Sequence, residues 1–150
     1  MSKLKIGDNA PAINSVDQNG GAITLEQFKG KKVVLYFYPK DMTPGCTVQS
    51  CNLRDNYKVL LEKGYVVLGC SVDSPERHVK FIEKYDLLFS LISDESKEVV
   101  NAYGVWGLKK FMGKEYMGIS RTTFVIDEKG IIEDIIEKVN TKEHTSQILN

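Results

Sequence analysis

The sequence predicts an α/β protein with a mixed central sheet flanked by helices, and three observations support this class. Two apolar runs rich in valine and aromatic residues, at 31–39 and 65–73, are typical of strands buried on both faces. Segments with helical spacing of apolar residues follow both runs, as in the βαβ units of a parallel sheet. Two strand-like stretches within 121–139 flank a short turn and predict an antiparallel hairpin, so the sheet is expected to be mixed.

Local signals place the remaining elements. The turn Gln-Asn-Gly-Gly at 18–21 predicts an opening hairpin. Ser74 and Pro75 suit the N-cap and first position of a helix, and Gly64 suits a helix stop. The residues at 140 and 143, Asn and Glu, have the spacing of a capping box. The expected strands are 13–17, 22–24, 31–39, 65–73, 89–93 and both arms of 121–139, and the expected helices are 43–64, 74–85, 95–103 and 140–149.

Length and composition bound the class of protein. The 150 residues contain no internal repeat or linker, so we expect one domain over 1–150. The 20 basic and 20 acidic residues cancel, which leaves no overall field to attract nucleic acid or an anionic membrane. The start of the chain has no apolar core of a signal peptide, and no apolar run approaches the ~20 residues of a membrane span. We therefore expect a cytoplasmic protein, in which a bridge among the three cysteines would be transient and catalytic.

The segment Thr-Pro-Gly-Cys at 43–46 places Cys46 between a buried strand and the helix that follows it. In such sheets, ligands bind at the C-terminal ends of the strands. A thiol at a helix N-terminus faces unpaired N–H groups and the positive end of the dipole, which favour the thiolate. Pro44 has no N–H to leave unsatisfied, Gly45 permits close approach to the sulfur, and Thr43 can offer its hydroxyl to the sulfur or a substrate. The alternative is a simple strand-to-helix turn with Cys46 as a small buried residue.

Cys51 lies five positions after Cys46, and this spacing is compatible with a buried pair, a metal site, a structural disulfide or a redox nucleophile. Thioredoxin-like redox motifs have two residues between the cysteines, whereas this pair has four. A structural zinc site needs four nitrogen or sulfur ligands at close spacings. The remaining candidates, Cys70, His78 and His144, are dispersed, so we expect no metal site.

The stretch at 38–51, Tyr-Pro-Lys-Asp-Met-Thr-Pro-Gly-Cys-Thr-Val-Gln-Ser-Cys, resembles the active-site segment of peroxiredoxins. It is similar in particular to the bacterioferritin comigratory protein group, also called the PrxQ type. The family pattern Pro-x3-Thr-x2-Cys is met by Pro39, Thr43 and Cys46. The resemblance implies a thioredoxin fold with an N-terminal β-hairpin extension. It spans nearly the whole chain, because it also covers 7–13, 71–85, 103–127 and the terminal hairpin.

The resemblance implies a role for each residue that matches the motif. Cys46 would be the peroxidatic cysteine, whose thiolate attacks the terminal oxygen of a hydroperoxide. Thr43 would hydrogen-bond to the peroxide, and Pro39 would shield the pocket. Arg121 would lie beside Cys46, lower the energy of its thiolate and bind the charge that builds on the peroxide oxygens. Cys51 matches the resolving cysteine of many members of the group.

The implied activity is a thiol-dependent peroxidase that reduces hydrogen peroxide and organic hydroperoxides. Cys46 would become a sulfenic acid and condense with Cys51 to a disulfide, which thioredoxin or a similar dithiol would reduce. The resemblance implies no metal, haem or flavin cofactor, and a monomer or, as in some members, a dimer. Two alternatives come from other classes: a peroxide sensor or thiol switch with little turnover, and a non-catalytic thioredoxin-fold binding module.

The spacing of the cysteine pair carries a geometric consequence. In a continuous helix Cys46 and Cys51 differ by a rise of ~7.5 Å and have Cα atoms ~8.7 Å apart. A disulfide needs Cα atoms within about 6.8 Å, so the helix must unwind before the pair can be bridged. Gln49 departs from several other peroxiredoxin subfamilies, which carry Glu there, and this leaves the orientation of Arg121 open.

The other candidate residues are expected to be structural. Cys70 lies within a predicted strand and should be a small buried residue. His78 is expected on the solvated face of its helix, and His144 in the last helix, neither with a partner that suggests catalysis. Trp106 and Phe111, in the glycine-punctuated loop 104–113, suit either the core or a collar around the reactive pocket.

Overall fold

A seven-stranded mixed sheet forms the centre of the protein, whose computed structural model describes residues 4–149. Its strands are β1 (Asn14–Val16), β2 (Ala22–Thr24), β3 (Lys32–Phe37), β4 (Tyr65–Ser71), β5 (Ser90–Ser93), β8 (Thr122–Ile126) and β9 (Ile132–Ile136). The strand order is β2-β1-β5-β4-β3-β8-β9. Strands β3, β4 and β5 are parallel, and the other neighbours are antiparallel. The mixed sheet predicted from the sequence is confirmed.

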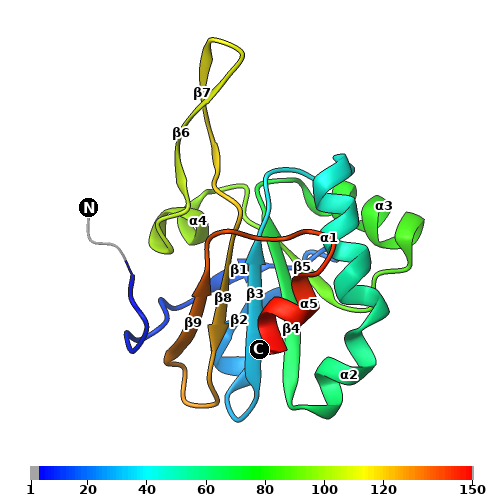
Figure 1. Cartoon of the computed structure of the whole chain (residues 1–150), viewed down its shortest axis with the longest axis vertical. Helices are drawn as coiled ribbons and strands as arrows, with labels where there is room; N and C mark the ends of the chain where they lie inside the picture. The colour runs from blue at the N-terminus through cyan, green and yellow to red at the C-terminus, as the bar shows by residue number, and fades with distance from the viewer. Residues whose placement is uncertain (1–3, 150) are drawn as a thin grey trace.

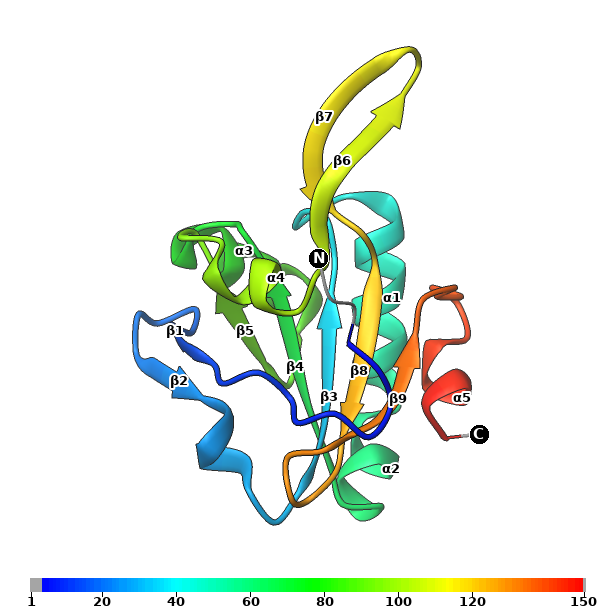
Figure 2. The same ribbon diagram turned by 90° about the vertical axis from the view of Figure 1, so that its left-hand side faces the viewer.

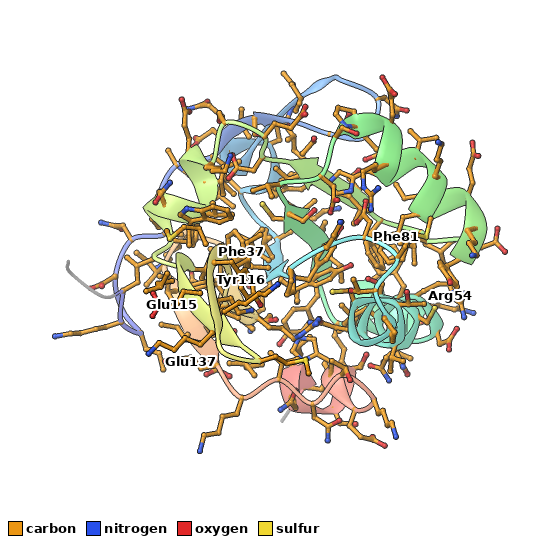
Figure 3. All side chains as sticks on the ribbon, turned by 90° about the horizontal axis from the view of Figure 1, so that it is seen from above. Phe37, Arg54, Phe81, Glu115, Tyr116 and Glu137 are labelled. Carbon is orange, nitrogen blue, oxygen red and sulfur yellow. The ribbon has the colours of Figure 1, made fainter. Side chains whose placement is uncertain are left out.

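Helices cover both faces of this sheet (Figures 1 and 2). They are α1 (Pro44–Asp55), α2 (Tyr57–Glu62), α3 (Pro75–Tyr85), α4 (Glu98–Ala102) and α5 (His144–Leu149), with a 3-10 helix η1 (Leu25–Phe28) after β2. Successive residues of β3 point to opposite faces, because side chains alternate along a strand. Tyr36 packs with residues of α1, α2, α3 and α5, whereas Leu35 and Phe37 pack with residues of α4. Seen from above, Arg54 of α1 and Phe81 of α3 lie on the side of the sheet opposite to α4 (Figure 3).

Every predicted strand is present, and most are shorter than predicted by one to three residues at an end. Helix α3 begins as predicted, because its N-cap Ser74 accepts a hydrogen bond from the backbone N–H of Arg77 at 3.3 Å. The predicted helix 43–64 is instead two helices, because the chain leaves the helical conformation at Asn56 (φ −108°, ψ 10°). Gly64 follows α2 with φ +86°, a conformation that suits glycine at a helix end.

The closing helix is shorter than predicted. It begins at His144 rather than at position 140, so the predicted capping box is wrong. Asn140 instead heads a turn, in which its side-chain oxygen accepts from the backbone N–H groups of Lys142 and Glu143. The N–H of Asn140 itself donates to the side chain of Gln147 at 2.9 Å, in place of the Glu143 side chain. Helix α4 is also shorter than its prediction, since it begins at Glu98.

A third hairpin, β6 (Trp106–Phe111) and β7 (Lys114–Ile119), corrects the prediction of a loop at 104–113. It forms a separate two-stranded sheet that projects from the body of the protein (Figures 1 and 2). The two residues between the strands, Met112 and Gly113, have φ of 51° and 80°. Positive φ at both positions is typical of the tight turns that join antiparallel strands. Within the described residues, no helix is long and apolar enough to cross a membrane.

Gly69 in β4 is buried between Tyr36 of β3 and Leu91 of β5, its partners in the two neighbouring strands. A Cβ atom at this position would lie 2.6 Å from the side chain of Leu91 and 2.9 Å from the ring of Tyr36. We therefore expect Gly69→Ala to lower the free energy of unfolding by about 1–3 kcal/mol, measured by urea titration. Gly107→Ala is the matched control in β6, where a Cβ would meet no atom within 4 Å. Equal stability of the two variants would contradict this packing argument.

Candidate active site

Cys46 is the third residue of α1, and its side chain is fully buried. The N-cap of α1 is Thr43, which is extended (φ −76°, ψ 151°) and whose hydroxyl does not cap the helix. That hydroxyl donates instead to the backbone carbonyl of Lys40 at 2.9 Å. The first backbone N–H groups of α1 therefore remain free of a side-chain cap near Cys46, and they favour negative charge on the sulfur.

Arg121 contacts the sulfur of Cys46, although 75 positions separate the two residues. It directly precedes β8, and β8 runs antiparallel to β3 with Thr122 opposite Phe37. The first residues of β8 and the last residues of β3 therefore lie side by side at the same end of the sheet, where α1 also begins. At this edge the Nη2 atom of Arg121 lies 3.3 Å from Cys46 Sγ.

Gln49 and Gly45 determine how Arg121 is oriented. The Nη1 atom of Arg121 donates to the buried side-chain oxygen of Gln49 at 2.6 Å. Since Gln49 is neutral, this contact fixes the guanidinium without neutralising its charge. A Cβ atom at Gly45 would lie 3.2 Å from Arg121 Nη2, so the absence of a side chain there leaves room for the guanidinium. Gly45 therefore allows the Arg121 guanidinium to lie close to the backbone of α1.

The other candidate residues lie nearby along the chain. Pro39 is half-buried just beyond β3, and Thr43 is half-buried at the start of α1. Cys51 is half-buried in the same helix as Cys46, and both thiols are free. Both cysteines lie inside the continuous helix α1, and ideal helix geometry places Cα atoms five residues apart at about 8.7 Å. The structure therefore corresponds to the reduced protein.

Cys70 is buried and free in β4, as predicted. Burial, with a smaller contribution from the charge of Asp94, raises the pKa of the Cys70 thiol well above its usual value. At neutral pH this thiol is protonated and therefore a poor nucleophile.

Both histidines are fully buried, which contradicts the prediction for His78, whereas His144 lies in the last helix as predicted. His78 is not on a solvated face: its Nδ1 lies 2.7 Å from the Asp41 carboxylate, and its Nε2 lies 3.0 Å from the backbone carbonyl of Ile92. His144 Nε2 lies 2.8 Å from the hydroxyl of Thr123, two residues along the chain from Arg121. Burial lowers the pKa of His144, and the nearby charge of Arg121 lowers it further.

One group of side chains has the composition of a metal site. Within the described residues, ligand-type atoms of Asp41, Asp73 and His78 all lie within 4.8 Å of one another. Each of these atoms already has a protein hydrogen-bond partner. Besides its contact with His78, Asp41 accepts from the hydroxyl of Tyr38, and Asp73 accepts from its neighbours Ser71, Arg77 and the Asp41 N–H. The group is thus a closed hydrogen-bonded network, and it contains neither Cys46 nor Cys51.

Comparisons with known proteins identify the family. The AhpC/TSA family matches residues 6–135. Peroxiredoxin Bcp of Escherichia coli (strain K12) is 49% identical over 150 residues, which are 100% of this chain and 96% of that protein. Peroxiredoxin Bcp of Bacillus subtilis (strain 168) is 45% identical over 146 residues, which are 97% of this chain and 93% of that protein.

Solved structures agree with these sequence relatives. Xanthomonas campestris peroxiredoxin Q has a TM-score of 0.85 at 32% identity, and the match covers 91% of this chain and 87% of that chain. Peroxidoxin BcpB from Mycobacterium tuberculosis has a TM-score of 0.86 at 34% identity, with 97% and 94% covered. The fold and the comparisons define a peroxidase of the thioredoxin fold that depends on a thiol. The chain belongs to the AhpC/TSA family, and its relatives are peroxiredoxins of the Bcp and PrxQ group.

We expect Arg121→Ala to slow the reaction of Cys46 with peroxide by about 10²-fold, the usual cost of removing one donor from a site of developing charge. It should also slow alkylation of Cys46, because the guanidinium beside the attacking sulfur is then absent. Gln49→Ala keeps the charge of Arg121 but removes the hydrogen bond that orients its guanidinium. We therefore expect this variant to react with peroxide more slowly than the wild type but faster than Arg121→Ala. Stopped-flow peroxide kinetics and alkylation rates across pH measure both effects, with exposed Lys58→Ala as control. An alkylation profile unchanged in Arg121→Ala would exclude this activating role.

Proposed function

We propose that Cys46 is the peroxidatic nucleophile of this enzyme. The observation that carries the proposal is the 3.3 Å contact between Arg121 Nη2 and Cys46 Sγ at the N-terminus of α1. The thiolate attacks the terminal oxygen of a hydroperoxide, so that an S–O bond forms and the O–O bond breaks. The leaving oxygen takes a proton and departs as water or an alcohol. Arg121 stabilises the negative charge that passes from the sulfur to the peroxide oxygens.

Thr43 and Pro39 complete the proposed peroxide site. The Thr43 hydroxyl donates to the Lys40 carbonyl, so its oxygen can accept a hydrogen bond from the hydroperoxide O–H. Pro39, half-buried between β3 and α1, shields the sulfur from water. A solved structure of the Xanthomonas campestris bacterioferritin comigratory protein is described in terms of alkyl peroxide reduction activity. We infer that this chain acts on organic hydroperoxides as well as hydrogen peroxide.

Cys51 is the proposed resolving cysteine. Its thiol condenses with the Cys46 sulfenic acid, which forms an S–S bond and releases water. Since both residues lie in α1, the helix must unwind before the sulfur atoms can meet. The unwound segment then exposes the disulfide to an external dithiol, for which thioredoxin is our candidate, and two electrons from that dithiol restore both thiols. We assign this cycle to a single catalytic domain that acts in the cytoplasm as a monomer or a dimer.

Asn52 ties the segment that must unwind to the C-terminal helix. Its side-chain N–H donates to the carbonyl of Lys142 at 2.8 Å, and its side-chain oxygen accepts from the N–H and the hydroxyl of Thr145, both at 2.8 Å. Each such bond contributes about 0.5–1.5 kcal/mol to the closed state. These contacts oppose the opening of α1 next to Cys51.

Peroxide turnover with each thiol variant tests the proposed cycle. Cys46→Ser should abolish peroxide consumption, because among the described residues only Cys46 combines a position at a helix N-terminus with an arginine in contact with its sulfur. Cys70→Ser should keep most of the activity, since Cys70 is buried and its pKa is raised. The assay uses thioredoxin with its reductase and, separately, glutathione. Substantial turnover by Cys46→Ser would refute the mechanism, and a peptide map that shows mainly a Cys46–Cys70 bridge would remove Cys51 from it.

Asn52→Ala should speed disulfide formation after a single equivalent of peroxide by about fivefold or more, because three hydrogen bonds are lost. The lost hydrogen bonds outweigh the ~0.5 kcal/mol by which alanine favours a helix, and 1.36 kcal/mol corresponds to tenfold in rate. The rate is measured by quenching the reaction and determining the mass of the product. Asn101→Ala, in the exposed part of α4, is the matched control. A rate equal to that of the wild type would show that release of α5 does not limit the step.

A further inference from the structure

Asp41 and His78 form a buried pair next to the proposed peroxide site, and no step of the mechanism uses them. Asp41 is 1% exposed and His78 is 0% exposed, so neither charge can be solvated by bulk water. Asp41 lies in the connection between β3 and α1, and His78 lies in α3. The pair therefore links the β3–α1 connection, which contains Pro39 and Thr43, to α3, which contains none of the proposed catalytic residues.

Hydrogen-bond geometry fixes how many protons the pair holds. The Ile92 carbonyl can only accept, so the His78 Nε2 atom, at 3.0 Å, carries a proton. A second proton must lie between His78 Nδ1 and Asp41 Oδ2, which are 2.7 Å apart. The other carboxylate oxygen of Asp41 accepts from the Tyr38 hydroxyl at 2.6 Å. With both protons in place the pair is neutral overall, as a fully buried pair of ionisable groups requires.

The charges that face this pair are themselves balanced. Asp73, which is 7% exposed, accepts from the Asp41 N–H at 2.8 Å and from Arg77 Nε at 2.9 Å. Arg77 thus compensates Asp73 at the edge of the network, and His78 compensates Asp41 at its centre. Removing either member of the central pair would leave its partner buried and uncompensated.

Asp41 holds a strained connection. The next residue, Met42, has φ of 70°. This backbone conformation is unfavourable for residues other than glycine and persists only when the surrounding structure enforces it. Asp41 enforces it through three buried contacts, made by its N–H and both carboxylate oxygens. The same short connection carries Pro39 on one side and Thr43 on the other. The position of both groups relative to Cys46 therefore depends on Asp41.

We propose that Asp41 and His78 are positioning residues that hold Pro39 and Thr43 in place for peroxide, while the activation of the Cys46 thiolate is left to Arg121 and α1. This inference rests on the proposed function, since it concerns the same reaction. It separates two properties of the site: the ionisation of the sulfur and the placement of the substrate. A purely structural role would change stability without separating them.

The test compares two reactions of Cys46 in the reduced protein. Asp41→Asn should lower the second-order rate constant with hydrogen peroxide by about tenfold to 10²-fold, the cost of a displacement near 1 Å. The rate with iodoacetamide, which needs the thiolate but no peroxide site, should not change. His78→Gln should behave in the same way, and the double variant should lose no more than either single one, because the pair acts as a unit. Exposed Asp86→Asn is the matched control.

The outcomes are distinguishable. If wild-type Cys46 is not oxidised by peroxide, the proposed function fails. If wild-type Cys46 is oxidised but Asp41→Asn reacts equally fast, or if both reactions fall together, the positioning role alone is refuted. Should the variants fail to fold, proton NMR of the wild type decides. Slowly exchanging, strongly downfield ring N–H protons of His78 support the pair, and rapid exchange of those protons with water overturns it.

Discussion

The contact between Arg121 and Cys46 is the interaction on which the rest of the site depends. Cys46 and Cys70 are equally buried, and burial alone disfavours a thiolate. For Cys70 that effect dominates, and its pKa is raised. Cys46 has two features that favour negative charge on sulfur: a guanidinium 3.3 Å from its Sγ atom and a position in the first turn of a helix. Two equally buried cysteines therefore have different roles: Cys70 in β4 is an inert core residue, and Cys46 in α1 is the candidate nucleophile.

Helix α1 meets two opposed requirements. It must be intact to present its N-terminus to Cys46, and in our proposal it must open for Cys51 to reach that residue. The surrounding contacts are divided accordingly. The Arg121 guanidinium and the Asp41 network hold the connection and the first turn, whereas Asn52 holds the later part against α5. In our proposal α1 opens first from the side of Cys51, and the unwinding then reaches the first turn while the strands of the sheet remain in place.

The sequence predicted the elements whose signals are local. Apolar runs identified β3 and β4, and turn residues identified both hairpins of the main sheet. The hairpin β6–β7 was missed because it projects from the body and most of the β7 residues are exposed, so it has no alternation of buried and exposed residues. In addition, Met112 at a positive φ is not a typical turn residue. Its one signal was Gly113 at the second turn position.

The site was predicted unevenly for a similar reason. The resemblance supplied Arg121, since no local pattern brings together residues 75 positions apart. His78 was placed on a solvated face, although the helical spacing of 78, 81, 82 and 85 puts it on the stripe that packs against the sheet. Weighing that spacing above the polar nature of histidine would have predicted its burial. Its partner Asp41 lies in an irregular connection, where the sequence has no period to read.

Hydrogen exchange along α1 tests the central claim most directly. The reduced protein and the protein treated with one equivalent of peroxide are compared, with the Cys46–Cys51 disulfide verified by mass. The account predicts that residues 43–53 are protected in the reduced protein and lose that protection once the disulfide forms, while β3 and β4 keep theirs. Equal protection of 43–53 in both states, with the disulfide present, would contradict it.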